Sequence, residues 1–326
     1  MAYRFDSDES VRAAILRCAG EQLDHAVQEL TERVGQDPVE AVHSARKAIK
    51  RERSLLRLAR GSMDTGQRRR ENRALRDAAR SLSTARDGEA MLETLDELAE
   101  RYVGQLPEAT FRQIRELLQT RRDRERRELI GSSVAAEAAD RLHAVRARQG
   151  EWRIATDGWR AVERGLRRSY GDGRKLFSRA RAQPATGEWH NWRKRVKDLW
   201  YQEQLLATVA GPAVKGQAKD AHALADLLGD EHDLDVLEQA LRRERETPPV
   251  DLDAVLALLD LRRRELRDEA IRLGGRVYCE SPKRFSRRMR SAWKAGCGDA
   301  HARGERDPVE IAQAVRPTPA PSAAAP

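Results

Sequence analysis

The segment from Val42 to Arg60, VHSARKAIKRERSLLRLAR, places basic side chains along one face of a predicted helix and apolar side chains along the other. A similar arrangement returns in the second half of the chain, from Trp189 to Tyr201, as WHNWRKRVKDLWY. One constant offset aligns four residues of the first segment with identical residues of the second. The matched pairs are His43 with His190, Arg46 with Arg193, Lys47 with Lys194, and Lys50 with Lys197. The repeat predicts an internally duplicated chain.

Length and composition favour a helical protein. The chain has 326 residues, which suits two domains or one duplicated domain. Hydrophobic residues make up 40%, charged residues 35% and aromatic residues only 5%. This composition is typical of amphipathic helices rather than of sheets, so we expect an all-α fold.

The sequence contains no membrane-targeting signal that we can identify. It has no apolar run of about 18 residues, and its start, MAYRFDSDES, lacks the apolar segment of a signal peptide. We therefore expect a cytoplasmic protein. Cys18, Cys279 and Cys297 are odd in number and lack metal-site spacing, which indicates ordinary thiols in a reducing compartment. We expect neither a metal ion nor a cofactor.

Apolar periodicity predicts a series of helices. Asp37 and Pro38 indicate a helix start, with Asp as the N-cap and Pro at the first helical position. In the first half we expect five helices: one at 9–34, one from 37 that carries the first motif, one after the turn at 61–66, one from 87 and one from 107. In the second half we expect a helix at 152–170, a break at Gly171 and Gly173, the helix that carries the second motif, and helices at 252–273 and 282–293. The tail, 304–326, is poor in apolar residues and is expected to be disordered.

Positive charge is concentrated on a few of these helices, although the formal net charge is only +9. The third helix carries Arg69, Arg73, Arg76 and Arg80 at the spacing of a single helical stripe. Lys215, Lys219 and His222 match the first three of these arginines in the second half, while Asp226 stands opposite Arg80. Like charges on one face repel each other, so such stripes indicate a polyanionic partner rather than a stabilising feature.

One cluster admits a metal-site interpretation. Asp230, Glu231, His232 and Asp233 follow each other directly, but the first half has no equivalent ligand set. We favour a helix-capping role for them over metal binding.

Four segments resemble the CHAD family, the conserved histidine α-helical domain. They are HSARKAIKRERSLLRL, RGLRRSYGDGRK, HNWRKRVKDLWYQEQLL and LLGDEHDLDVL. The resemblance covers residues 8–295, with halves of about 8–150 and 151–295. It implies two four-helix bundles related by a pseudo-twofold axis, with basic helices lining a central cavity that binds inorganic polyphosphate. Two residues depart from the pattern, since Asp198 replaces the cation found at Arg51 and Asp226 interrupts the second stripe. We therefore expect weaker phosphate binding by the second half.

Polyphosphate carries about one negative charge per unit along a flexible chain, so its receptor needs cations along a path and no catalytic centre. We expect His43 and His190 to donate hydrogen bonds to phosphate and to gain charge beside it, with a structural role as the alternative. The candidate binding residues are His43, Arg46, Lys47, Lys50, Arg57, Arg69, Arg73, Arg76, Arg80, Arg164, Arg167, Arg168, Arg174, Lys175, His190, Arg193, Lys194, Lys197, Lys215, Lys219 and His222.

Two other functions are compatible with the charge. A non-specific nucleic-acid binder is one, but aromatic residues for base stacking are scarce near the stripes. An accessory subunit of a phosphate-hydrolysing enzyme is the other. The sequence has no ExExK pattern, P-loop or nucleophile arrangement, so we expect a non-catalytic, monomeric polyphosphate-binding protein that could target polyphosphate granules.

Overall fold

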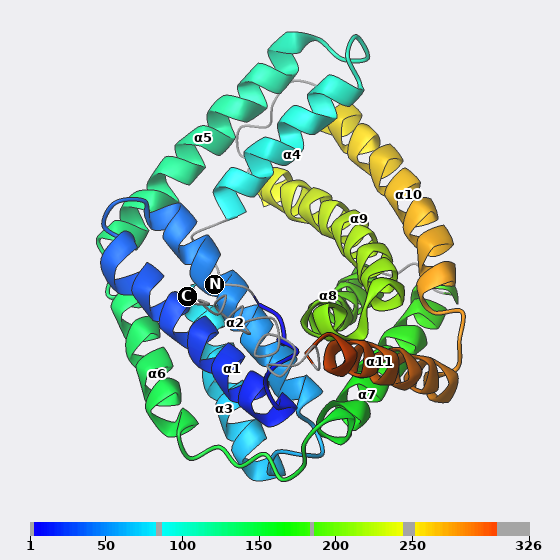
Figure 1. Ribbon diagram of the computed structural model, residues 1–326. Coiled ribbons are helices and arrows are strands. Elements are labelled where there is room, and N and C mark those ends of the chain that lie inside the picture. The colour runs from blue at the N-terminus through cyan, green and yellow to red at the C-terminus, as the bar shows by residue number, and fades with distance from the viewer. Residues whose placement is uncertain (1–2, 83–86, 183–185, 244–251, 305–326) are drawn as a thin grey trace, which may run out of the picture.

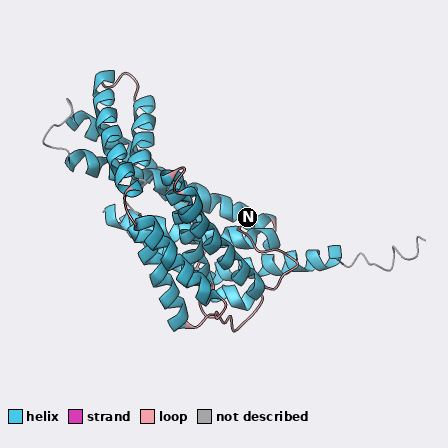
Figure 2. Ribbon diagram, turned by 90° about the vertical axis from the view of Figure 1, so that its left-hand side faces the viewer, coloured by secondary structure: helices cyan, strands magenta, loops and turns pink. Residues whose placement is uncertain are grey.

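Every regular element that the structure describes is a helix. The computed structural model describes residues 3–82, 87–182, 186–243 and 252–304. Its elements are α1 (Val11–Gln28), the π-helical turn η1 (Glu29–Arg33), α2 (Pro38–Leu58), α3 (Thr65–Ser81), α4 (Asp87–Arg101), α5 (Glu108–Ile130), α6 (Val134–Gln149), α7 (Trp159–Ala182), α8 (Thr186–Ala210), α9 (Pro212–Arg243), α10 (Leu252–Val277) and α11 (Pro282–Gly304) (Figure 1). The expected all-α fold is confirmed, and Figure 2 shows helices joined by loops in the described part.

None of the helices in the described ranges combines the length and apolarity needed to cross a bilayer. The predicted disordered tail begins at Gly304, the last residue of α11, and its remaining residues, 305–326, lie outside the described residues.

The helix that carries the first motif begins where the sequence predicts. The Asp37 side chain accepts a hydrogen bond from the backbone N–H of Glu40, and Pro38 occupies the first turn of α2. The apolar face of α2, which includes Val42, Ala45, Ile49 and Leu56, is fully buried. This face fixes the direction in which the basic residues of α2 point.

The prediction for the helix before the second motif was wrong at two places. Helix α7 begins at Trp159 rather than at residue 152, and it continues through Gly171 and Gly173 without a break. A Cβ atom on Gly173 would lie 2.4 Å from the hydroxyl oxygen of Tyr278. Gly173 therefore allows a close approach of Tyr278 to α7 and does not end the helix.

Three further boundaries differ from the predicted ones. Helix α9 is a continuous helix of 32 residues, so Asp230–Asp233 lie in its interior and the capping interpretation of this cluster was wrong. Helix α6 lies in a stretch for which the sequence predicted no separate helix. Helix α11 continues to Gly304, well beyond the predicted end at residue 293.

The buried apolar residues form two clusters, and each cluster draws on both halves of the chain. The larger contains the N-terminal segment, α1–α3, α6–α8, α11 and the first half of α9. The smaller joins α4 and α5 to the second half of α9 and the first half of α10, at the top of Figure 1. The duplication into two bundles is therefore not confirmed by this packing and stays a prediction.

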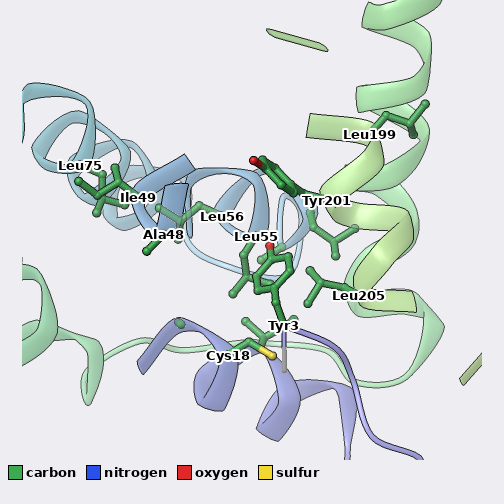
Figure 3. Packing of buried hydrophobic residues seen from close by; sticks show 14 of the residues in the cluster. Tyr3, Cys18, Ala48, Ile49, Leu55, Leu56, Leu75, Leu199, Tyr201 and Leu205 are labelled. Carbon is green, nitrogen blue, oxygen red and sulfur yellow. The ribbon is translucent and has the colours of Figure 1, made fainter. Parts of the chain in front are cut away.

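The residues before α1 belong to the core. Tyr3 and Phe5, which precede the predicted domain start at residue 8, are almost fully buried. Figure 3 shows the Tyr3 ring between α1, α2 and α8, and its hydroxyl group donates a hydrogen bond to the backbone oxygen of Arg51, 2.8 Å away. The N-terminal segment thus helps to hold α2 against α8, the two helices that carry the repeated motif.

Candidate functional site

Helices α2 and α8 bring their basic residues together. Along α2 and its C-terminal end, cations recur every three or four residues from Arg46 to Arg60, and α8 contributes three consecutive cations beside them. We call the combined series, with the arginines of α3 and α7 that adjoin it, the basic track. Its members are Arg46, Lys50, Arg53, Arg57, Arg60, Arg68, Arg164, Arg168, Arg193, Lys194 and Arg195.

One end of the basic track is a small pocket between α2, α4, α8 and α9. Arg46, Lys50, Arg193 and His232 line it, together with Asp233 and apolar residues of α4 and α9. Its volume is only about 70 Å³. Arg46 is held in place by a hydrogen bond of 2.9 Å from its Nη1 to the backbone oxygen of Ala79. We call this the inner pocket.

Two histidines meet beside the inner pocket. The rings of His190 and His232 lie 4.5 Å apart, centre to centre. Burial, followed by the charges of Lys194 and Arg193, lowers the pKa of His190 to about 4. Burial and the nearby cations, Arg193 first, lower the pKa of His232 to about 3. Both rings are therefore neutral at neutral pH unless an anion lies beside them.

The middle of the basic track lies where α2 packs on α8. Nη1 of Arg57 donates a hydrogen bond to Oδ1 of Asp198 at 3.0 Å, and Nη1 of Arg195 lies 3.0 Å from Oδ2 of the same carboxylate. Burial and the charge of Arg57 lower the pKa of neighbouring Arg53 to about 10. The sequence predicted Arg57 as a phosphate ligand, and the structure places it in a largely buried ion pair with Asp198.

The other end of the basic track opens into a groove between α7 and the start of α11. Arg60, Arg164, Arg167, Arg168 and Lys283 line this groove, whose volume is about 690 Å³. Asp172 is its one acidic lining residue, and its Oδ2 accepts a hydrogen bond of 3.0 Å from Arg168. We call this the outer groove. An adjoining cavity of about 810 Å³ shares Gly171 and Pro282 with it and is lined by Arg174, Lys175 and Arg179, with Glu188 as its acid.

Several cations of the basic track have pKa values that are lowered by burial and by neighbouring cations. After burial, the largest influences that lower the pKa of Lys194 are Arg195 and Arg53, and those on Arg57 are Arg195 and Arg60. Arg168 and Arg164 lower the pKa of Arg60, and Arg60 in turn lowers that of Arg68. Such shifts require short distances between like charges, so cations connect the inner pocket to the outer groove, with Asp198 as the acid among them.

Acidic residues bound the inner end of the basic track. A cavity of about 530 Å³ between α4, α9 and α10 is lined by Glu93, Glu97, Asp230 and Asp233, and Asp233 also lines the inner pocket. Burial, together with Glu97 and Asp233, raises the pKa of Asp230 to about 6. Among the described residues, no group of three or more His, Cys, Asp or Glu side chains is arranged to hold a metal ion.

His43 lies one turn before Arg46 on α2 but lines a different pocket from the inner one. Its pocket is lined by the acidic residues Asp37, Glu40, Glu89 and Glu93, with Arg126 from α5. The repeat that aligns His43 with His190 in sequence therefore places the two rings in different electrostatic surroundings.

Other predicted residues lie on exposed surfaces. The α3 stripe is solvent-exposed, and Nη2 of Arg76 lies 2.9 Å from Asp77. On α9, His222 stacks on Trp200 at 4.0 Å between ring centres and faces Asp226. The exposed candidates outside the basic track and its adjoining cavities are Lys47, Arg69, Arg73, Arg76, Arg80, Lys215, Lys219 and His222, while Lys197 is half-buried.

Sequence reasoning missed several members of the site. They are Arg53, Arg60, Arg68, Arg179, Arg195, His232 and Lys283. The same i, i+3 and i+4 spacing that identified the α3 stripe also joins Arg46, Lys50, Arg53, Arg57 and Arg60. Arg53 and Arg60 could therefore have been predicted from the sequence. Lys283 and Arg195 join the site through tertiary packing, for which the local sequence carries no signal.

Comparisons with known proteins agree with this fold. The family model of the CHAD domain matches residues 17–242. The crystal structure of the CHAD domain from the plant Ricinus communis has a TM-score of 0.59 at 16% identity, covering 84% of this chain and 94% of that one. PptA from Streptomyces chartreusis has a TM-score of 0.54 at 18% identity, covering 88% and 100%. A comparison with curated proteins gave no significant match. Since the family model spans more than half of the sequence, the chain belongs to the CHAD domain family.

Proposed function

We propose that this protein binds inorganic polyphosphate along the basic track. The observation that carries the proposal is the series of cations along α2 and its C-terminal end, from Arg46 to Arg60, which joins the inner pocket to the outer groove. Repulsion between these like charges destabilises the folded protein. A flexible polyanion that neutralises them one after another removes this repulsion. Membership in the CHAD family supports the same ligand, because the sequence motifs resemble those of polyphosphate-binding domains.

The geometry of the basic track suits a chain of phosphates better than a compact anion. The inner pocket, about 70 Å³ in volume, has room for little more than one phosphate group, while the outer groove holds about 690 Å³. A polyphosphate chain would lie across both, with arginine guanidinium groups donating paired hydrogen bonds to its non-bridging oxygens and lysines acting as point charges. The predicted pseudo-twofold relation between the α2 and α8 motifs would explain why the two helices supply cations to one path.

Nucleic acid is the competing ligand, and one observation counts against it. Five of the six tryptophans, at positions 152, 159, 189, 192 and 293, are buried, and Trp200 is covered by Tyr201 and His222. Single-strand binders stack bases on exposed aromatic rings. The basic track offers phosphate contacts without such a stacking surface among the described residues.

We further propose that binding is non-catalytic and that the protein acts as a monomer, for example in association with polyphosphate granules. A competition assay tests the ligand. Labelled long-chain polyphosphate is bound and then displaced by unlabelled polyphosphate, single-stranded RNA or duplex DNA at equal phosphate concentration. We expect polyphosphate to displace the label at concentrations well below those needed for either nucleic acid. Equal or stronger displacement by RNA would replace the proposal with nucleic-acid binding, and release of orthophosphate during the assay would contradict a non-catalytic role.

A further inference from the structure

The basic track contains one buried carboxylate at its centre. Asp198 is 6% exposed, and its two oxygens each lie 3.0 Å from an arginine, Arg57 of α2 and Arg195 of α8. Along α2, Lys50 of the inner pocket comes before Arg57, and Arg60 of the outer groove comes after it. Asp198 thus stands at the crossing between the two ends, which a phosphate chain that follows α2 would pass.

The backbone fixes this carboxylate in place. The hydroxyl group of Ser54 donates a hydrogen bond of 2.8 Å to the backbone oxygen of Asp198, and the amide of Gln202 donates one of 3.2 Å to the backbone oxygen of Ser54. All three residues are buried where α2 meets α8. Since the carboxylate cannot swing away with a flexible loop, a phosphate that binds Arg57 or Arg195 must compete with it.

We propose that Asp198 divides the basic track into two segments and penalises the phosphate chain that spans them. The inference rests on the proposed polyphosphate binding and concerns its selectivity. Each segment takes a short chain without meeting the carboxylate. A long chain gains contacts at both ends but brings a phosphate oxyanion next to a fixed negative charge at the crossing. Asp198 therefore sets how steeply affinity rises with chain length.

Replacement of the carboxylate tests this role directly. The variant Asp198→Asn keeps the size and a hydrogen-bond acceptor for Arg57 while it removes the charge. We expect its affinity for long-chain polyphosphate to rise about tenfold, the effect of removing one like charge at close range in a half-buried site. Affinity for tripolyphosphate should change less than twofold, because a short chain does not need the crossing.

A matched control removes the same charge elsewhere. Asp24 of α1 pairs with Arg146 of α6, at 2.7 Å between Oδ1 and Nε, so Asp24→Asn also frees an arginine. This variant should bind both ligands as the unmodified chain does. An unchanged or weaker affinity of Asp198→Asn for long chains, or an equal gain for tripolyphosphate, would overturn the inference.

The unmodified chain supplies a second measurement that holds if Asp198→Asn does not fold. Calorimetric titration with tripolyphosphate should saturate at two or more molecules per chain, and titration with long-chain polyphosphate at one chain. A single tripolyphosphate site would show that the basic track is undivided. Absence of binding by either polyphosphate would instead contradict the proposed function itself, so the two failures are distinguishable.

Discussion

Gly165 of α7 lies directly against the backbone oxygen of Leu58, at the end of α2. A Cβ atom on Gly165 would be only 1.9 Å from that oxygen and 2.5 Å from the backbone oxygen of Arg57. This contact lets α7 cross close to the C-terminal end of α2, and it brings Arg164 and Arg168 beside Arg60. The absence of a side chain at Gly165 therefore allows α7 to pack close enough to α2 for the outer groove to join the rest of the basic track.

The variant Gly165→Ala should be destabilised, because neither backbone can give way without moving a helix. We expect the free energy of unfolding to fall by about 1–3 kcal/mol, as for other overpacked sites. Chemical denaturation measures the change. Gly216→Ala is the matched control, since a Cβ there meets nothing within 4 Å and the residue lies inside α9. That variant should be neutral or slightly more stable. Equal stability of both variants would contradict the close crossing.

Burial of Glu52 should make stability depend on pH. Burial raises the pKa of its carboxyl to about 8, against an ordinary value of 4.5. Between these two values the folded state binds a proton that the unfolded state has lost, so the contribution of Glu52 to stability falls as pH rises from about 4.5 to about 8. Glu52→Gln removes the titration. We expect this variant to be more stable at pH 7 by about 1–3 kcal/mol, with the difference vanishing near pH 4.

Urea denaturation at several pH values tests the Glu52 prediction. Glu137→Gln serves as the control, because it makes the same substitution at a side chain that is 54% exposed. A constant difference between Glu52→Gln and the unmodified chain from pH 4 to pH 8 would show that the Glu52 carboxyl does not titrate in that range.

Charge reversal within the basic track should weaken polyphosphate binding and its response to salt. The double variant Arg53→Glu with Arg60→Glu should bind long-chain polyphosphate at least tenfold more weakly. Each lost phosphate contact should also reduce the slope of log affinity against log salt by about 1. Arg124→Glu on α5 changes an exposed arginine outside the basic track and should leave both quantities nearly unchanged. A salt slope that is the same for all three proteins would argue against counterion release along this path.

The histidine pair should couple binding to proton uptake. In the free protein, His190 and His232 have pKa values of about 4 and about 3, and a bound phosphate raises both. Affinity should therefore increase as pH falls below 7 toward 4, a lower window than the ordinary imidazole value suggests. The double variant His190→Gln with His232→Gln should lose this increase, and His143→Gln, at an exposed position of α6, should retain it. A pH profile of the double variant that matches that of the unmodified chain would assign the pair to structure alone.

The sequence correctly predicted those features of the helices that depend on residues close together in the chain. The start of α2 follows from Asp37 and Pro38, and its buried face follows from apolar spacing. The sequence did not predict that α7 continues through Gly173, because a glycine inside a helical pattern usually indicates a break. The structure shows that Gly173 instead makes room for Tyr278, which packs against it. The same holds for the site. Arg53 and Arg60 fit a helical stripe, but the pairing of Arg57 with Asp198 joins residues 141 positions apart in the chain. Only the packing of α2 on α8 shows that an acid interrupts the cations.

The shared apolar cluster of α4, α5, α9 and α10 has a consequence for how this chain can be divided. A genetic cut near residue 150, where the repeat places its boundary, would separate Met91, Leu95 and Ile114 from Leu237 and Leu259, which bury them. Each fragment would then carry an open apolar face and would associate with itself or with its counterpart rather than fold alone. The smallest unit that could be transplanted into another protein with its binding surface intact is therefore the whole helical assembly, even though the motif that defines it occurs twice.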